Sequence, residues 1–188
     1  MNVGANSVTD TGLYFQWGDT QGYTASQVGP GSGQKPFQEG DYKYYSVGSF
    51  TKYNSTDGKT VLDLSDDAVA AAWGGNWRMP TTSEFQALGA AVNAVWINNY
   101  NGSGVNGLVC TDKTDSSKVL FFPAAGYAGD NSVISVGYNC KCVSSSLDAG
   151  GENFAFIYIL ESYDDGYVDW VGKYYRYYGF TVRGILDE

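Results

Sequence analysis

The sequence contains no histidine and only three cysteines among its 188 residues. Histidine is the commonest general base and metal ligand in proteins, so its absence excludes Ser-His-Asp and Cys-His nucleophile systems. Cys110, Cys140 and Cys142 are an odd set, which is not a disulfide framework. We expect small buried side chains here, with one bridge to Cys110 as an alternative. A thiolate site would need a carboxylate as its fourth ligand, so we predict no metal and no cofactor.

Basic residues are also scarce. Eleven Lys and Arg stand against 20 Asp and Glu, which gives a formal net charge of −9. Proteins that bind phosphate backbones need clustered basic residues, so we predict no nucleic-acid partner. No run approaches the roughly 20 apolar residues of a membrane-spanning helix, so we predict no membrane insertion. The first six residues have neither the basic start nor the apolar core of a signal peptide, and we expect the chain to be the C-terminal part of a longer protein.

Aromatic residues are abundant, at 16% of the chain. With this length they favour one domain, spanning residues 1–188, with a core of its own. We expect an aromatic strand at 13–17, followed by a long loop at 20–57 that aromatic side chains fasten to the body. These fastening side chains are predicted to be Tyr42, Tyr44, Tyr45, Phe50 and Tyr53.

Two helices are predicted next. The first begins at Ser65, its candidate cap, and stops at residues 74–75, with Asp66 and Asp67 favouring the helix dipole rather than holding calcium. The second follows Pro80, where Thr81 and Glu84 have the spacing of a capping box. We expect it to run to about Asn98, with an apolar stripe that belongs to the core. The stripe comprises Phe85, Leu88, Val92, Val95 and Trp96.

The remainder alternates between strands and turns. Residues 107–111 and 118–122 flank a polar turn and predict a hairpin. Residues 133–143 predict one further strand, which the serine run 144–146 ends as a polar turn. A strand at 154–160 leads to the tight-turn dipeptide Asp165-Gly166, and residues 179–185 predict a closing strand. The fold class is therefore predicted to be α+β.

Several motifs resemble a known group of domains. The segments WGGNWRMPT at 73–81, FFPAAGY at 121–127 and RYYGFTVR at 176–183 are similar to C-type-lectin-fold domains of formylglycine-generating enzymes and of the variable proteins of diversity-generating retroelements. Over nearly the whole chain, the sequence resembles a paralogous family of gut bacteria and their phages. The resemblance implies two helices packed on small antiparallel sheets, with the N- and C-terminal strands paired.

The resemblance also implies that residues 126–183 form a variable ligand-binding region. Nine of the 16 tyrosines fall there beside Ser, Gly and Asn, a mixture typical of adaptable binding faces. In this family, mutation at adenines in the coding DNA limits the residue types that a variable position can hold. By that rule, the invariant framework would include Lys141, Glu152, Trp170 and Lys173. The candidate variable, ligand-binding residues are Ile134, Tyr138, Cys140, Cys142, Val143, Asp148, Ala149, Asn153, Phe154, Phe156, Tyr158, Tyr163, Asp165, Tyr167 and Asp169.

The resulting expectation is a non-enzymatic domain that recognises a cell-surface protein or glycan, hypervariable through a retroelement and carried on a phage virion, at a tail fibre or receptor-binding tip, or on the bacterial surface. Three alternatives remain open. The tyrosines suit ordinary strand packing. Cys140 and Cys142 suggest a copper oxidase of the formylglycine-generating type, although a one-residue gap departs from that family's wider spacing. An assembly domain of a fibre or envelope, acting as a homo-oligomer, would also use an aromatic patch.

Overall fold

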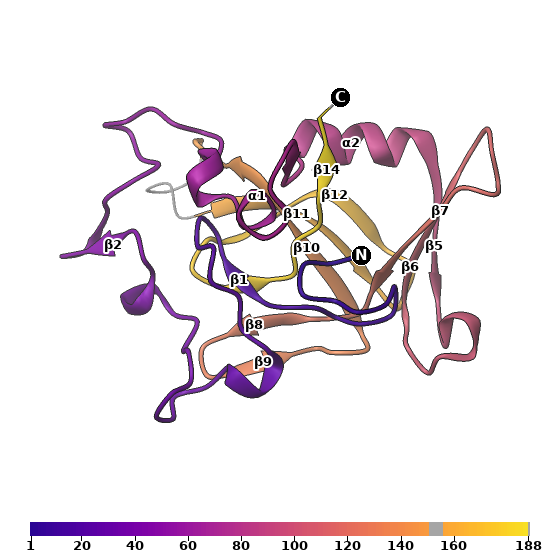
Figure 1. Ribbon diagram of the computed structural model, residues 1–188, viewed down its shortest axis with the longest axis horizontal. Coiled ribbons are helices and arrows are strands. Elements are labelled where there is room, and N and C mark those ends of the chain that lie inside the picture. The colour runs from indigo at the N-terminus through magenta and orange to yellow at the C-terminus, as the bar shows by residue number, and fades with distance from the viewer. Residues whose placement is uncertain (151–155, 188) are drawn as a thin grey trace.

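A computed structural model describes residues 1–150 and 156–187. Two α-helices and several small antiparallel sheets make up the described part, which is an α+β architecture (Figure 1). No helix in the described ranges is both long enough and apolar enough to span a bilayer. The helices are α1 (Ala68–Trp73) and α2 (Thr82–Ala91).

The central sheet consists of β10 (Asn139–Leu147), β11 (Phe156–Tyr163) and β12 (Val168–Tyr175), in that order. Side chains from both of its faces are buried. One face contributes Val143, Ile157 and Ile159 to the main core, while the other contributes Leu160 and the cysteines of β10 to a second core.

Helix α2 covers the second face of this sheet (Figure 1). The contact is close because Gly89 has no side chain. A Cβ atom there would lie 2.7 Å from the indole ring of Trp170 on β12. Phe85 and Leu88 of α2 belong to the second core, as the sequence predicts.

The end of α2 differs from the prediction. The helix stops at Ala91, and β5 (Val92–Ile97) follows in place of the expected last two turns. Side chains of β5 alternate between buried and exposed, and Val95 is 55% exposed. β-Branched residues favour extended backbone, and pairing with β6 satisfies the backbone groups that a longer helix would use. Val95 is therefore not part of the core stripe.

Strand β6 (Gly107–Asp112) pairs in turn with β7 (Val119–Pro123), so the predicted hairpin is confirmed. A second prediction in this region is wrong, because residues 133–143 do not form one strand. They divide between β9 (Ser132–Ile134) and the start of β10. A turn separates them, with positive φ at Ser135 and Gly137.

The two ends of the chain meet in a third sheet. Strand β1 (Phe15–Gln16) pairs with β13 (Gly179–Phe180), and β8 (Tyr127–Gly129) and β9 continue the sheet. The amide of Val3 also donates to the carbonyl of Val182 at 3.0 Å. β14 (Ile185–Leu186) pairs with β4 (Trp77–Arg78). Pairing of the N- and C-terminal strands is thus confirmed.

The long segment before α1 is held by buried aromatic and basic side chains. It contains a small hairpin, β2 (Tyr45–Ser46) with β3 (Ser49–Phe50). Tyr42 donates to the carbonyl of Trp17 at 2.7 Å, and Arg176 donates to that of Tyr53 at 2.8 Å. Burial of Tyr42 and Tyr53 confirms that tyrosines anchor this segment.

Side-chain acceptors cap the N-termini of both helices. Asp67, rather than Ser65, caps α1 by accepting from the amides of Val69 and Ala70 at 2.8 and 2.9 Å. Ser65 lies two residues before this cap, within the short 3-10 helix Leu64–Asp66. At α2 the capping box is confirmed, since the amide of Thr81 donates to Glu84 at 2.7 Å.

Candidate functional site

Four of the predicted contact residues are buried. Asp148 is 6% exposed and forms an ion pair with Lys173. Cys140, Cys142 and Val143 are 1%, 2% and 1% exposed, and their side chains point into the two cores on either side of β10. They cannot touch a partner in this conformation, so including them among the contacts was wrong. The alternating-strand prediction failed here because β10 is covered on both faces.

The other predicted residues fall into separate places. Ile134 lies on β9, where it pairs with Tyr127 of β8 and is half-buried. Phe156 pairs with Tyr175 at the first position of β11. Asn153 and Phe154 lie outside the described residues. What remains gathers in two groups, one at each end of β11.

The first group, which we name the hairpin-tip surface, comprises Tyr138, Tyr163, Asp165, Tyr167 and Asp169. Tyr138 is 65% exposed and Tyr167 52% exposed. Two chain segments meet here, because the backbone amide of Asp164 donates to the carbonyl of Tyr138 at 3.1 Å. The rings of Tyr163 and Tyr167 lie 6.0 Å apart. The hydroxyl of Tyr167 is 3.3 Å from the carboxylate of Asp169.

A buried lysine supports this surface from below. The side chain of Lys141 is 2% exposed and forms an ion pair with Glu161. Its ammonium group also lies 3.1 Å from the hydroxyl of Tyr163 and 4.5 Å from the ring centre of Tyr174. Burial, reinforced by Glu161, raises the pKa of Tyr163, so this hydroxyl stays protonated. The prediction that Lys141 belongs to the framework agrees with its burial.

The second group contains Asp148, Ala149 and Tyr158, at the opposite end of the central sheet. Tyr158 is half-buried, and its hydroxyl lies 3.2 Å from the carboxylate of Asp148. The same carboxylate accepts from Lys173 of β12 at 2.7 Å. Although burial opposes it, this bond lowers the pKa of Asp148, so the pair is ionised and neutral as a whole. Ala149 is exposed just beyond β10.

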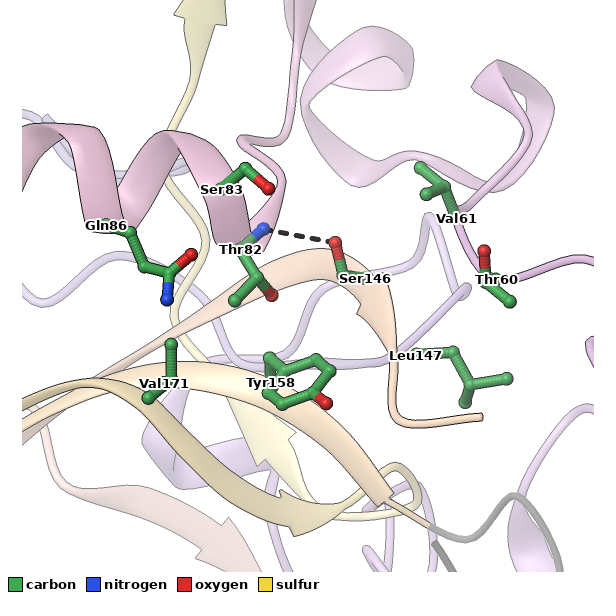
Figure 2. Close-up of a pocket in the computed structure, with 9 residues that line it drawn as sticks. All are labelled: Thr60, Val61, Thr82, Ser83, Gln86, Ser146, Leu147, Tyr158 and Val171. Atoms are coloured by element: carbon green, nitrogen blue, oxygen red, sulfur yellow. Dashed lines mark hydrogen bonds between the residues drawn. The ribbon is translucent and has the colours of Figure 1, made fainter. Parts of the chain in front are cut away.

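Tyr158 also lines an open pocket, which we name the helix-start pocket (Figure 2). The pocket has a volume of ≈ 480 Å³, within the range of about 300–1,000 Å³ of small-molecule sites. Its walls come from the start of α2, the ends of β10 and β11, β12 and the segment before α1. The lining residues are Thr60, Val61, Thr82, Ser83, Gln86, Ser146, Leu147, Tyr158 and Val171.

Hydroxyl groups fix the floor of this pocket. The amide of Thr82 donates to the hydroxyl of Ser146 at 3.0 Å (Figure 2), and the hydroxyls of Thr82 and Ser144 lie 3.1 Å apart. Ser144 donates in turn to the carbonyl of Tyr158 at 2.9 Å. The serine run was predicted to be a polar turn, and that prediction is wrong. It lies within β10, where its hydroxyls join the sheet to the first turn of α2.

The cysteines have a different character. Cys110, Cys140 and Cys142 are free and buried, so the alternative of a bridge to Cys110 does not apply. Burial raises the pKa of Cys110 and of Cys142 to about 12. A reactive or copper-binding thiol needs an environment that favours the thiolate, and these positions do the opposite. Among the described residues, no group of three metal-ligating side chains is arranged to hold an ion.

Sequence reasoning missed most of the helix-start pocket. Thr82 and Ser146 were assigned to a helix start and a turn, and Gln86 and Val171 were not singled out. They are far apart in the chain and meet only because α2 packs across the β10–β11–β12 sheet. Small polar side chains at the start of a helix and within a buried strand were the available signal.

The two places offer different groups. The hairpin-tip surface offers aromatic and acidic groups, and the helix-start pocket offers uncharged hydroxyls and an amide. Comparison with protein-family models, curated proteins and solved structures gave no match for this chain.

Proposed function

We propose that this chain is a non-enzymatic ligand-binding domain with a C-type lectin fold, whose contact face includes the hairpin-tip surface. The observation that carries the proposal is the pair of exposed tyrosines, Tyr138 and Tyr167. They project from two chain segments that a backbone hydrogen bond joins. Tyrosine gives a rigid contact area with one polar tip, and exposed side chains of this kind are favoured anchors at interfaces.

The rigidity of the base supports the same proposal. Buried Lys141 and half-buried Glu161 and Tyr163 form a polar network beside the exposed tyrosines. A surface that is ordered before binding loses less conformational freedom when a partner docks. This arrangement allows exposed positions to change while the buried network keeps the hairpin in place.

Charge indicates the kind of partner that would approach this face. Asp165 and Asp169 flank Tyr167, Asp164 lies beside them, and the whole chain carries a formal charge of −9. Such a field speeds association with a positively charged surface and weakens with added salt. We therefore propose a protein or glycan target on another cell that presents basic groups here, with the domain displayed on a phage receptor-binding tip or a bacterial surface.

The binding proposal is tested on arrays of surface proteins and glycans. The double variant Tyr138→Ala/Tyr167→Ala should lose binding to any target that the native chain retains. Tyr45→Ala, on the β2–β3 hairpin outside this surface, should bind normally. If the double variant binds every target as the native chain does, the hairpin-tip surface is not the contact face. If sedimentation shows a stable oligomer that the double variant dissolves, the tyrosines serve self-association instead.

Diversification by a retroelement is a separate part of the proposal, supported by the sequence resemblance. With the four buried positions removed, the remaining members of the candidate set are the residues we expect to vary. The test is the coding DNA. A near-identical template repeat with mismatches only at adenines, close to a reverse-transcriptase gene, is the expected finding, and its absence would remove this part.

A further inference from the structure

We propose that the helix-start pocket is a binding site for one ring of a neutral carbohydrate. The pocket lies at the opposite end of β11 from the hairpin-tip surface, so this inference is independent of the proposed function. It rests on the chemistry of the lining groups, on their rigidity and on the charge balance of the walls.

The lining groups match the chemistry of a sugar. Hydroxyls of Thr60, Thr82, Ser83 and Tyr158 line the pocket together with the amide of Gln86. A hydroxyl both donates and accepts, and a primary amide carries donors and an acceptor. A sugar ring presents the same two-way groups at close spacing, so each can find a partner. Leu147 and Val171, on opposite sides of the pocket, add apolar groups for the C–H groups of the ring (Figure 2).

Within the described ranges, the lining offers an anion such as phosphate no charged side chain as a partner. No basic side chain lines the pocket among the described residues. The ammonium group of Lys173 lies 5.4 Å from the ring centre of Tyr158 and is paired with Asp148. Because these two charges cancel, the wall favours a neutral ligand. The acidic net charge of the chain adds to the repulsion of anions.

The pocket is built before any ligand arrives. The bond from Thr82 to Ser146 and the contact between Thr82 and Ser144 hold α2 at a fixed distance from β10. The hydrogen bond between Tyr158 and Asp148 fixes the phenol ring. Gln86 is exposed, and its side-chain amide is oriented to pair with a ligand. Binding then costs side-chain ordering at Gln86 and little elsewhere in the pocket.

The test uses the whole chain and nuclear magnetic resonance titration. The probes are methyl α-D-mannopyranoside, methyl β-D-galactopyranoside and methyl N-acetyl-β-D-glucosaminide, with inorganic phosphate and acetyl-trialanine amide as competitors. At least one glycoside should give saturable shifts of the amides of Ser83, Gln86 and Ser146. In saturation-transfer difference spectra, irradiation of the protein methyl groups should reduce the signals of the sugar protons on one face of the ring more than those on the other.

Variants then place the site. Gln86→Leu should weaken glycoside binding at least tenfold, because a sugar hydroxyl would lose its partner in the site. Gln38→Leu, which alters an exposed glutamine elsewhere, should leave glycoside affinity unchanged. Both variants should have the same thermal unfolding midpoint as the native chain. Tyr138→Ala/Tyr167→Ala should bind the glycoside normally, which separates this site from the hairpin-tip surface.

Three results would overturn the proposal. The first is that none of the glycosides gives saturable shifts at the pocket amides. The second is that Gln86→Leu binds as well as Gln38→Leu. The third is that phosphate or the capped peptide moves the same amides at lower concentration, which would assign the pocket to an anion or a peptide instead.

Discussion

The charge of Glu84 is predicted to stabilise the junction between α2 and the rest of the fold. Its carboxylate accepts from Arg78 at 2.8 and 2.6 Å and from the amide of Thr81 at 2.7 Å. Glutamine also closes a capping box, so Glu84→Gln keeps the shape and one acceptor while it removes the charge. The variant therefore isolates the ionic part of the interaction.

The magnitude follows from the pKa of this carboxyl. Hydrogen bonds from Arg78 lower the pKa of Glu84 from 4.5 to about 2. At about 1.4 kcal/mol per unit, this shift corresponds to at most about 3 kcal/mol. The side chain is 30% exposed, and solvent screening reduces the value, so we expect Glu84→Gln to cost about 2 kcal/mol at pH 7.

The sign of the pH dependence is also determined. The folded-state pKa lies below the unfolded one, so the stabilisation is fully present above pH 4.5 and is lost as the pH falls towards 2. At pH 3 less than half of it should remain. Other carboxylates titrate equally in both proteins, so they cancel in the difference between them.

Urea unfolding of the native chain and of Glu84→Gln, at pH 7 and pH 3, measures this difference. Asp164→Asn, which alters an exposed carboxylate, is the matched control and should change stability by less than about 0.5 kcal/mol. A stability difference that stays constant between the two pH values would refute the reasoning, as would a loss at pH 7 no larger than that of the control.

Three further outcomes follow from the core. Arg176→Met should lower the free energy of unfolding by about 3 kcal/mol, because it leaves the carbonyls of Tyr53 and Lys52 without a donor. Limited proteolysis should then cut first within residues 42–53. Unchanged cleavage would contradict this anchoring role. Cys110, whose pKa burial raises to about 12, should resist iodoacetamide at pH 8 until urea unfolds the chain, and rapid labelling of the folded protein would contradict its burial. Gly126→Ala should destabilise by at least about 2 kcal/mol, since its φ is +63° and the new Cβ would lie 2.0 Å from the carbonyl oxygen of Ile134. Gly104→Ala, with φ of +79° and open space around it, is its control in thermal unfolding and should cost about 1 kcal/mol.

Local signals predicted much of the fold. The capping box at Thr81 and Glu84 and the hairpin at 107–123 depend on neighbours within a few residues, and both are present in the structure. The pairing of the N- and C-terminal strands came instead from family resemblance. The end of α2 was missed because Val92 and Val95 fit a helical stripe as well as a strand, and only pairing with β6 decides between the two.

The candidate contacts show the same limit. Composition identified the tyrosines of residues 126–183, and it could not separate Tyr138, which is exposed, from Tyr174, which packs on the buried Lys141. Likewise Cys140 and Cys142 passed a rule about residue types while lying in the core. Burial depends on what lies across the sheet, and no spacing within a single strand reports it. The helix-start pocket required five separate segments of the chain to meet.

The pairing of β1 with β13 has a consequence for how the chain folds. Phe15 and Phe180 are neighbours in the sheet although 165 positions separate them in sequence. Closing so long a loop is entropically costly and comes late in folding. During synthesis, the N-terminal strand therefore leaves the ribosome long before its partner exists, and the main core, which contains both phenylalanines, can close only after residue 180 has emerged. Until then the aromatic side chains of residues 14–17 depend on chaperones or on transient contacts to avoid aggregation.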